Sequence, residues 1–259
     1  MTPTTLALAL AAAVGLSIGS FLNVVIHRLP RGQSLVRPGS RCPGCGRSLR
    51  WYDNVPVVSF LVLAGRCRQC GARISWRYPA VEIVTALLFV AVVLLTPPGP
   101  LLAARLVLSA ALVALFAIDL EHQILPNAIT LPGIGIGFAF SLLGPPGWQS
   151  SLIGIVAGGA IPYGIAAAYL ALRGQEGLGM GDVKMLAMLG AFLGWQAMLL
   201  TLVLASFTGA VVGVALMATR GRGLQYALPF GTFLAVGAVA AMLAGEPVIA
   251  WYLGFFEGL

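Results

Sequence analysis

Long apolar segments alternate with short polar or Pro- and Gly-rich stretches along most of the chain. Helices satisfy their own backbone hydrogen bonds in hydrocarbon, and about 20 apolar residues suffice to cross a bilayer. The apolar runs are continuous rather than alternating, which disfavours a β-barrel. The pattern therefore predicts membrane-spanning helices at about 4–26, 79–96, 101–118, 124–144, 151–172 and 226–244, with one longer apolar run at 182–219.

The run at 182–219 is long for one membrane crossing and short for two. The basic residues that border it distinguish one crossing from two. If the chain turns near Gly194 and Trp195, the bordering basic residues return to the side of Asp182. The loops on the opposite side, near 97–100, 145–150 and 194–196, then carry no Lys or Arg. Because basic residues concentrate in cytoplasmic loops, we predict an all-α polytopic membrane protein with about eight transmembrane helices. The bordering residues are Arg173, Lys184, Arg220 and Arg222.

Composition agrees with a protein that faces lipid. The 259 residues are 59% hydrophobic and only 9% charged, whereas soluble domains carry about a quarter charged residues. Ten of the 15 basic residues are Arg residues between Arg28 and Arg77, which we interpret as one cytoplasmic loop rather than a nucleic-acid site, despite the net charge of +7. We expect a first transmembrane helix at 1–27, a cytoplasmic loop at 28–78 and a transmembrane core at 79–259. No basic segment precedes the first apolar run, so we expect that run to be retained as a span.

All four cysteines lie in this loop, as two Cys-x-x-Cys pairs, "CPGCG" and "CRQCG". Each pair can form a tight turn, with a Gly after its second Cys. Four thiolates meet the tetrahedral preference of Zn²⁺, and a Cys₄ site leaves no position open for water. Disulfides are disfavoured on the cytoplasmic side. The spacing predicts a structural zinc site formed by Cys42, Cys45, Cys67 and Cys70.

Two acidic residues lie at the inner ends of predicted spans. Asp119 follows the third span, in "FAIDLEHQILPNAITLP", and Asp182 opens the sixth, in "GMGDVK". Acids at membrane depth are costly and are functional candidates. If the two helices are neighbours, the carboxyl groups can share a proton and act as one base and one acid, as in an aspartyl peptidase. The alternative is that Asp182 only complements the dipole at a helix N-terminus.

Gly179 and Gly181 precede Asp182 and are candidate substrate-binding positions. Without side chains they would let a substrate backbone approach the acid closely. The alternative is a flexible loop before a helix. Lys184 lies two residues after Asp182, so it points elsewhere on a helix and is a candidate partner for a carboxylate or a lipid phosphate.

Other charged residues near the predicted spans have simpler interpretations. Glu121 and His122 are rivals of Asp119, although solvated loop positions account for both. Arg105 lies one turn inside a span, where its side chain can extend to the headgroups. Glu82, one turn into the second span, is a candidate partner for an Arg in "SWRYPAVE".

With these motifs in place, the chain closely resembles the bacterial type IV prepilin peptidases. "GSFLNVVIHRLP" (19–30) resembles the end of the family's first span, and the stretch from "CPGCG" to "SWRYPAVE" (42–82) resembles its zinc loop. "DLEHQILPNAITLP" (119–132) and "GMGDVK" (179–184) are similar to its two aspartate motifs, with Asp119 and Asp182 as the matching acids. Asn127 departs from the family pattern, in which an acidic residue is common after the Pro.

The resemblance implies a bifunctional leader peptidase and N-methyltransferase of the bacterial inner membrane. Its substrates would be prepilin or pseudopilin precursors of type IV pili or type II secretion, cut at the cytoplasmic membrane face. The new N-terminus would then be methylated with S-adenosylmethionine, although no Gly-rich nucleotide fingerprint follows a strand in this sequence. Two other classes stay open: an ion-coupled transporter that uses the same two acids, and a non-enzymatic assembly factor. No internal repeat of the transporter kind is visible.

Overall fold

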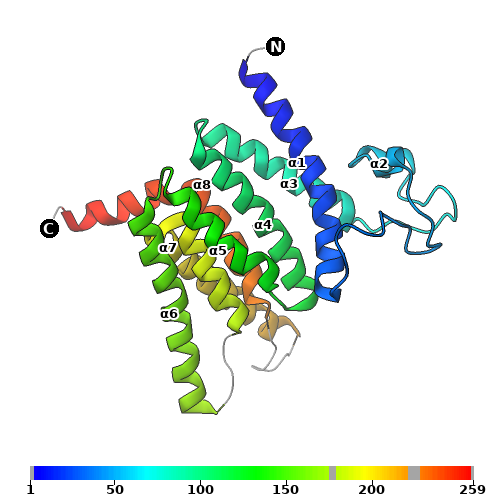
Figure 1. Cartoon of the computed structure of the whole chain (residues 1–259). Coiled ribbons are helices and arrows are strands. Elements are labelled where there is room, and N and C mark those ends of the chain that lie inside the picture. Colours follow the sequence, from blue (N-terminus) through cyan, green and yellow to red (C-terminus); the bar gives the residue numbers. More distant parts are fainter. Residues whose placement is uncertain (1–2, 175–178, 221–227, 258–259) are drawn as a thin grey trace. The chain divides into compact units, whose positions relative to one another are not determined.

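The computed structural model describes residues 3–174, 179–220 and 228–257, and their regular structure is helical apart from two isolated β-bridges (Figure 1). Two single-turn 3₁₀ segments, Leu29–Arg31 and Trp51–Asn54, lie between the first two α-helices. The α-helices are α1 (Pro3–Arg28), α2 (Val58–Val62), α3 (Arg77–Leu95), α4 (Pro100–His122), α5 (Asn127–Ser141), α6 (Trp148–Arg173), α7 (Met180–Arg220) and α8 (Phe230–Glu257).

The chain forms two compact units, Met1–Pro98 and Gly99–Leu259. The boundary that we expected at residue 78/79 therefore falls inside the first unit, because α3 packs against α1. Gly15 and Gly19 make this packing close. A Cβ at Gly15 would lie 2.6 Å from Ala86 Cα, and one at Gly19 would lie 2.6 Å from Glu82 Cα. A Gly-x-x-x-Gly pair of this kind lets two membrane helices approach to backbone distance.

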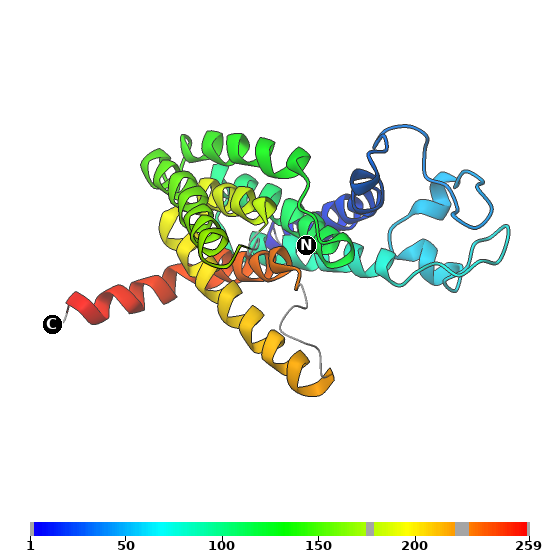
Figure 2. The same cartoon turned by 90° about the horizontal axis from the view of Figure 1, so that it is seen from below.

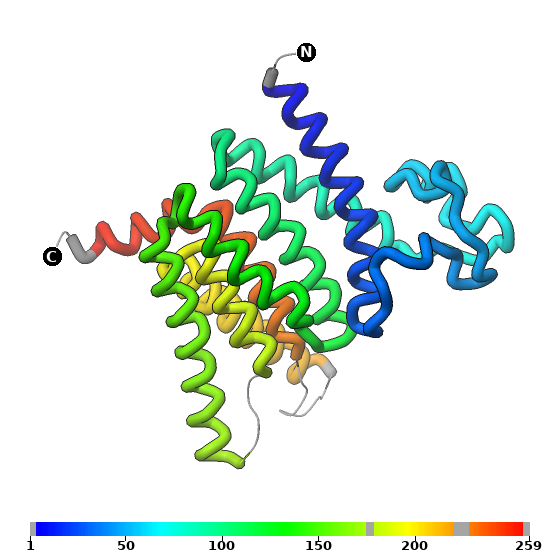
Figure 3. The backbone as a smooth tube through the Cα atoms, in the orientation of Figure 1, coloured from blue at the N-terminus to red at the C-terminus, as the bar shows by residue number. Residues whose placement is uncertain are grey.

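In the second unit, α6 packs directly on the first half of α7. A Cβ at Gly154 would lie 2.5 Å from the carbonyl oxygen of Gly190, and one at Gly158 would lie 2.5 Å from that of Leu186. The Ser151 hydroxyl adds a buried 2.8 Å hydrogen bond to the Ala191 carbonyl. Beyond this contact, the C-terminal part of α6 extends past the start of α7 (Figure 3).

Helix α7 reverses direction at Gly194, where the backbone angles are φ 78° and ψ 172°. The second half runs back along α8: the carbonyl oxygen of Thr201 faces Gly237, and Gly209 faces Phe233. Figure 2 shows the two halves of α7 running in different directions. The turn predicted near Gly194 is thus present, and a positive φ explains why a glycine occupies it.

Two of the turns that we predicted on the outer side, at 145–150 and 194–196, lie together in the second unit. Arg105, Pro146, Gln196 and Glu246 line a common cavity of about 230 Å³ there. Arg105 Nη2 lies 3.5 Å from Glu246 Oε1, so the side chain that we expected to extend to the headgroups has a carboxylate beside it.

By length and hydropathy, six described helices are long enough to cross a membrane: α1, α3, α4, α6, α7 and α8. Counting the halves of α7 separately and adding the 15-residue α5 gives the eight predicted segments. Helix α5 is shorter than the run at 124–144, since it begins only after Pro126. Helix α8 continues past residue 244, the predicted end of the last span, through Pro247 to Glu257. Arg222 and Tyr226, used to delimit the spans, lie outside the described residues.

Candidate active site and cysteine cluster

Asp119 lies in the last turn of α4 and is 4% exposed. Its Oδ2 accepts two hydrogen bonds from Thr232, at 2.7 Å from the backbone N–H and at 3.1 Å from the hydroxyl. Thr232 lies in the first turn of α8, where backbone N–H groups have no partner within the helix. The first turn of one helix therefore fixes an acid at the last turn of another.

Asp182 lies in the first turn of α7, at the same end of the unit as Asp119. Its backbone N–H donates to the carbonyl of Gly179 at 3.1 Å, which closes a turn ahead of the helix. The two carboxyl groups lie close enough for their charges to interact electrostatically. The structure thus brings together the two acids that the sequence separates by 63 positions.

Leu125 fills the space between the segments that carry the acids. A Cβ at Gly181 would lie 3.0 Å from Leu125 Cβ, and one at Gly231 would lie 2.9 Å from both Leu125 methyl carbons and 3.0 Å from Asp119 Oδ2. Gly181 therefore faces a leucine side chain rather than open space. A Cβ at Gly179 would lie 3.3 Å from Asp182 Oδ2. A substrate-binding role for Gly179 and Gly181 stays a prediction.

Sequence reasoning missed Leu125, Gly231 and Thr232. A signal for Thr232 was available, because "LPFGT" places a hydroxyl residue at the start of an apolar span, where it can bond a neighbouring polar group. Nothing in the sequence alone showed that this residue would meet Asp119.

The other polar candidates lie beside groups other than the two acids. His122 Nε2 lies 3.9 Å from Glu121 Oε2, and both side chains are partly exposed. Lys184 Nζ donates to Asn127 Oδ1 at 2.9 Å, so the lysine that we expected beside a carboxylate or a lipid phosphate has an amide partner. In the first unit, Glu82 accepts a 2.7 Å hydrogen bond from the Val57 N–H.

The four cysteines form one cluster in the first unit. The Sγ atoms of Cys42, Cys45, Cys67 and Cys70 all lie within 4.8 Å of one another, and those of Cys42 and Cys70 are 3.8 Å apart. Tetrahedral zinc with Zn–S bonds of about 2.3 Å separates its sulfurs by roughly 3.8 Å. The cluster has the donor set and the spacing to hold a metal ion.

Two similar turns present these thiols. The N–H of Gly46 donates to the carbonyl of Cys42 at 2.8 Å, and that of Gly71 donates to the carbonyl of Cys67 at 2.9 Å. Both glycines have a positive φ, near 70°, as the predicted turns require. Hydrogen bonds from the backbone N–H groups of Cys70 and Gln69 lower the pKa of the Cys67 thiol to about 6. Such bonds favour the thiolate, which is the metal-binding form.

Comparison with known proteins agrees with the division into two units. Residues 13–96 match the bacterial peptidase A24 N-terminal domain, and residues 106–214 match the type IV leader peptidase family. No solved structure shows a significant likeness to the chain.

Relatives named prepilin leader peptidase/N-methyltransferase resemble the chain over nearly its whole length. The protein from Aeromonas hydrophila is 42% identical over 93% of this chain and 92% of its own. The one from Burkholderia pseudomallei (strain 1026b) is 41% identical over 95% and 88%, and the one from Pseudomonas aeruginosa is 37% identical over 93% and 92%. With both family domains present in order and this degree of identity, the chain belongs to the type IV leader peptidase family, among the prepilin leader peptidase/N-methyltransferases.

Proposed function

We propose that this protein cleaves the leader of type IV pilin-like precursors with Asp119 and Asp182 as a catalytic pair. The observation that carries the proposal is the meeting of these acids at one end of the second unit, with Asp119 held by Thr232. Acids at the ends of apolar helices suit a scissile bond where an apolar substrate helix leaves the membrane.

We propose different roles for the two acids, supported by the hydrogen bonds that Asp119 accepts. Asp119 Oδ2 already accepts two donors, so the proton shared by the pair resides on Asp182. Asp119 then takes a proton from a water molecule, and that water attacks the peptide carbonyl. Asp182 gives its proton to the leaving amine.

We further propose that the chain methylates the new N-terminus, as the names of its relatives say of them. S-Adenosylmethionine, when bound, supplies an electrophilic methyl group. The neutral N-terminal amine would gain this methyl group and lose one proton.

Zinc is the metal that we propose for the cysteine cluster. The four sulfurs provide all the ligands of a closed tetrahedral site, so the ion would stabilise the loop rather than take part in hydrolysis. We place the protein in the bacterial inner membrane, with the loop and both acids at the cytoplasmic face. The basic residues concentrated in the loop support this orientation.

The test is cleavage of a synthetic prepilin by the purified full chain in detergent. Asp119→Asn and Asp182→Asn should each abolish cleavage while leaving thermal unfolding and metal content intact. Glu121→Gln is the matched control, since it removes an equal charge two residues from Asp119 and should retain activity. An active Asp119→Asn or Asp182→Asn variant would refute the catalytic pair, and a wild-type protein that never cleaves prepilin would refute the function.

A further inference from the structure

Polar side chains of helices α4 and α8 meet at two places along these helices. At one of them, Asp119 on α4 accepts the hydrogen bonds of Thr232 on α8. Fourteen positions away on each helix, Arg105 Nη2 of α4 lies 3.5 Å from Glu246 Oε1 of α8. A helix rises 1.5 Å per residue, so roughly 21 Å separates the two pairs. The proposed cleavage gives the second pair no role, although charges within membrane helices are costly and usually serve a function.

The Arg105–Glu246 pair lines a cavity of about 230 Å³. The most buried lining residues are apolar, among them Leu108, Phe192 and Met242, whereas the charged pair is less buried. An apolar lining with a few converging polar groups is typical of ligand sites. The volume is below the about 300–1,000 Å³ of sites for drug-sized molecules. The cavity therefore suits a small polar group that is attached to an apolar body.

Two exposed tryptophans indicate the level of this cavity in the bilayer. Trp148 begins α6 and is 52% exposed, and Trp195 follows the reversal of α7 and is 37% exposed. Pro146 and Gln196, close to them in the chain, line the cavity. Exposed tryptophans of membrane proteins gather at the level of the lipid headgroups. The charged pair is thus at the depth where headgroups surround the protein.

The two charged groups suit different parts of one headgroup. The Arg105 side chain is 15% exposed, and that of Glu246 is 87% exposed. A guanidinium carries five N–H groups, so Arg105 can contact both Glu246 and a phosphate. The Glu246 carboxylate has several acceptor positions and can bind an ammonium on its exposed side. A ligand with a phosphate and an ammonium a few bonds apart matches this pair.

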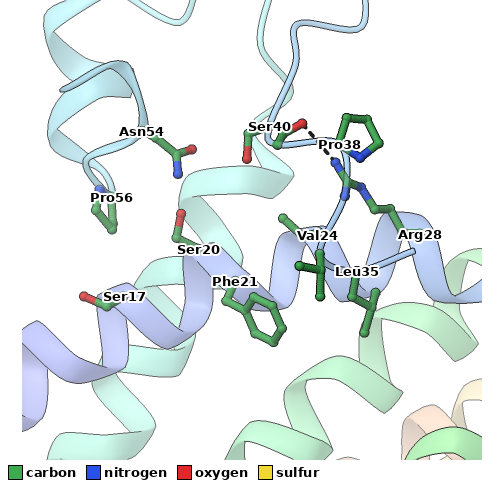
Figure 4. A pocket seen from close by; sticks show the side chains of 12 residues that line it. Ser17, Ser20, Phe21, Val24, Arg28, Leu35, Pro38, Ser40, Asn54 and Pro56 are labelled. Carbon is green, nitrogen blue, oxygen red and sulfur yellow. Dashed lines mark hydrogen bonds between the residues drawn. The ribbon is translucent and has the colours of Figure 1, made fainter. Parts of the chain in front are cut away.

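The cavity of the first unit lacks this combination of charges. Its arginine, Arg28, lies beside Pro38 and the loop (Figure 4). Arg28 Nη1 donates to the carbonyl of Ser34 at 3.0 Å, and Nη2 donates to that of Gly39 at 3.2 Å. Among the described residues that line this first cavity, none is acidic. Facing charges of opposite sign are therefore a feature of the cavity in the second unit.

We infer that the cavity of the second unit binds the headgroup of phosphatidylethanolamine, with the phosphate at Arg105 and the ammonium at Glu246. The acyl chains lie outside the cavity, along the lipid-facing surface of the helices. The headgroup bridges α4 and α8, the same helices that Asp119 and Thr232 join. An anionic headgroup without an ammonium offers no cation to Glu246 and adds a like charge beside it, which is unfavourable. The site is independent of the proposed cleavage.

The experiment measures lipid binding to the delipidated full chain by native mass spectrometry, with dioleoyl-phosphatidylethanolamine and dioleoyl-phosphatidylglycerol as probes. We expect the wild type to bind the ethanolamine lipid at least about 10-fold more tightly. Arg105→Gln should weaken that binding about 10- to 100-fold, since it removes a charged contact to the phosphate. Arg173→Gln is the matched control. It makes the same change on an exposed Arg of α6 outside the lining, and should bind normally.

Glu246→Gln tests the ammonium contact separately. Its side chain is largely exposed, so we expect this variant to fold, which a thermal unfolding transition like that of the wild type verifies. It should bind the ethanolamine lipid about 10-fold more weakly and phosphatidylglycerol as well as the wild type does or better. If Arg105→Gln does not fold, this change of preference alone decides.

Two results would overturn the inference directly. One is equal binding of the two lipids, or tighter binding of phosphatidylglycerol, by the wild type. The other is binding of the ethanolamine lipid at the wild-type level by folded Arg105→Gln or Glu246→Gln. Soluble O-phosphoethanolamine provides a further arm, because it carries the same two charges without acyl chains. Binding of this compound as tight as that of the lipid would assign the site to a soluble phosphate ester and would overturn the inference as well.

Discussion

Thr232 donates two hydrogen bonds to a single oxygen of Asp119, although 113 positions separate the two residues. One bond comes from the backbone and would survive any substitution other than proline. The other comes from the hydroxyl and can be removed alone. This pair therefore offers a controlled way to test how Asp119 is oriented.

Thr232→Val keeps the shape and the backbone donor but removes the hydroxyl. A hydrogen bond to a charged group contributes about 1.5–3 kcal/mol, so we expect kcat/KM for prepilin cleavage to fall about 10- to 100-fold. Thr232→Ser should restore most of the activity. Thr201→Val is the matched control, because Thr201 is also buried but its hydroxyl bonds to the Ala197 carbonyl, within its own helix. Equal losses in the Thr232→Val and Thr201→Val variants would show a general packing effect instead.

Substitution of Gly154 by Ala should destabilise the second unit. The new methyl group would lie 2.5 Å from the Gly190 carbonyl oxygen, a backbone atom that cannot rotate away. Overpacking costs about 1–3 kcal/mol, so the thermal unfolding temperature in detergent should fall. Gly159→Ala on the same helix has no neighbour within 4 Å and should leave the temperature unchanged or raise it. Similar behaviour of the two variants would contradict the close helix contact.

We expect the cysteine cluster to bind zinc, and the zinc content to fall when one of its four thiols is removed. Metal analysis of the wild-type protein should find one zinc per chain, and Cys42→Ser or Cys67→Ser should lower that value and make the loop sensitive to protease. Gln69→Ala, between two ligands, keeps all four thiols and should retain the metal. A wild-type protein without bound zinc would remove the basis for this prediction.

Asn127→Asp should have little effect. It turns the 2.9 Å hydrogen bond from Lys184 into an ion pair at an exposed position, and such pairs contribute about 0–1 kcal/mol. We expect unfolding temperature and cleavage rate to stay close to wild type. A large loss of activity would mean that the Lys184 side chain acts on Asp182 rather than on helix α5.

The sequence was most informative where function depends on spacing or on charge. Two Cys-x-x-Cys pairs specified a four-sulfur cluster, and the absence of basic residues near Gly194 indicated a reversal inside one apolar run. The two acids stood out because carboxylates at the ends of membrane helices are expensive. In each case a local pattern was enough to make the prediction, and the catalytic role of the two acids stays a prediction.

Contacts between distant segments were not predictable in the same way. Thr232 meets Asp119 only because α8 packs on α4, and no periodicity encodes that pairing. Helix α8 continues past residue 244 although Gly245 and Pro247 follow, residues that often mark a helix end. Proline is nevertheless tolerated within membrane helices, where neighbouring groups satisfy the freed backbone carbonyls.

The tie between Thr232 and Asp119 also bears on biogenesis. Both acids and the cysteine loop are synthesised before α8, yet the donors to Asp119 come from the first turn of that helix. A nascent chain that stops before Phe230 has both acids but lacks these donors. If Asp119 is catalytic as proposed, its side chain is oriented only after the start of α8 has been synthesised, and a shorter nascent chain is poorly equipped to cut precursors.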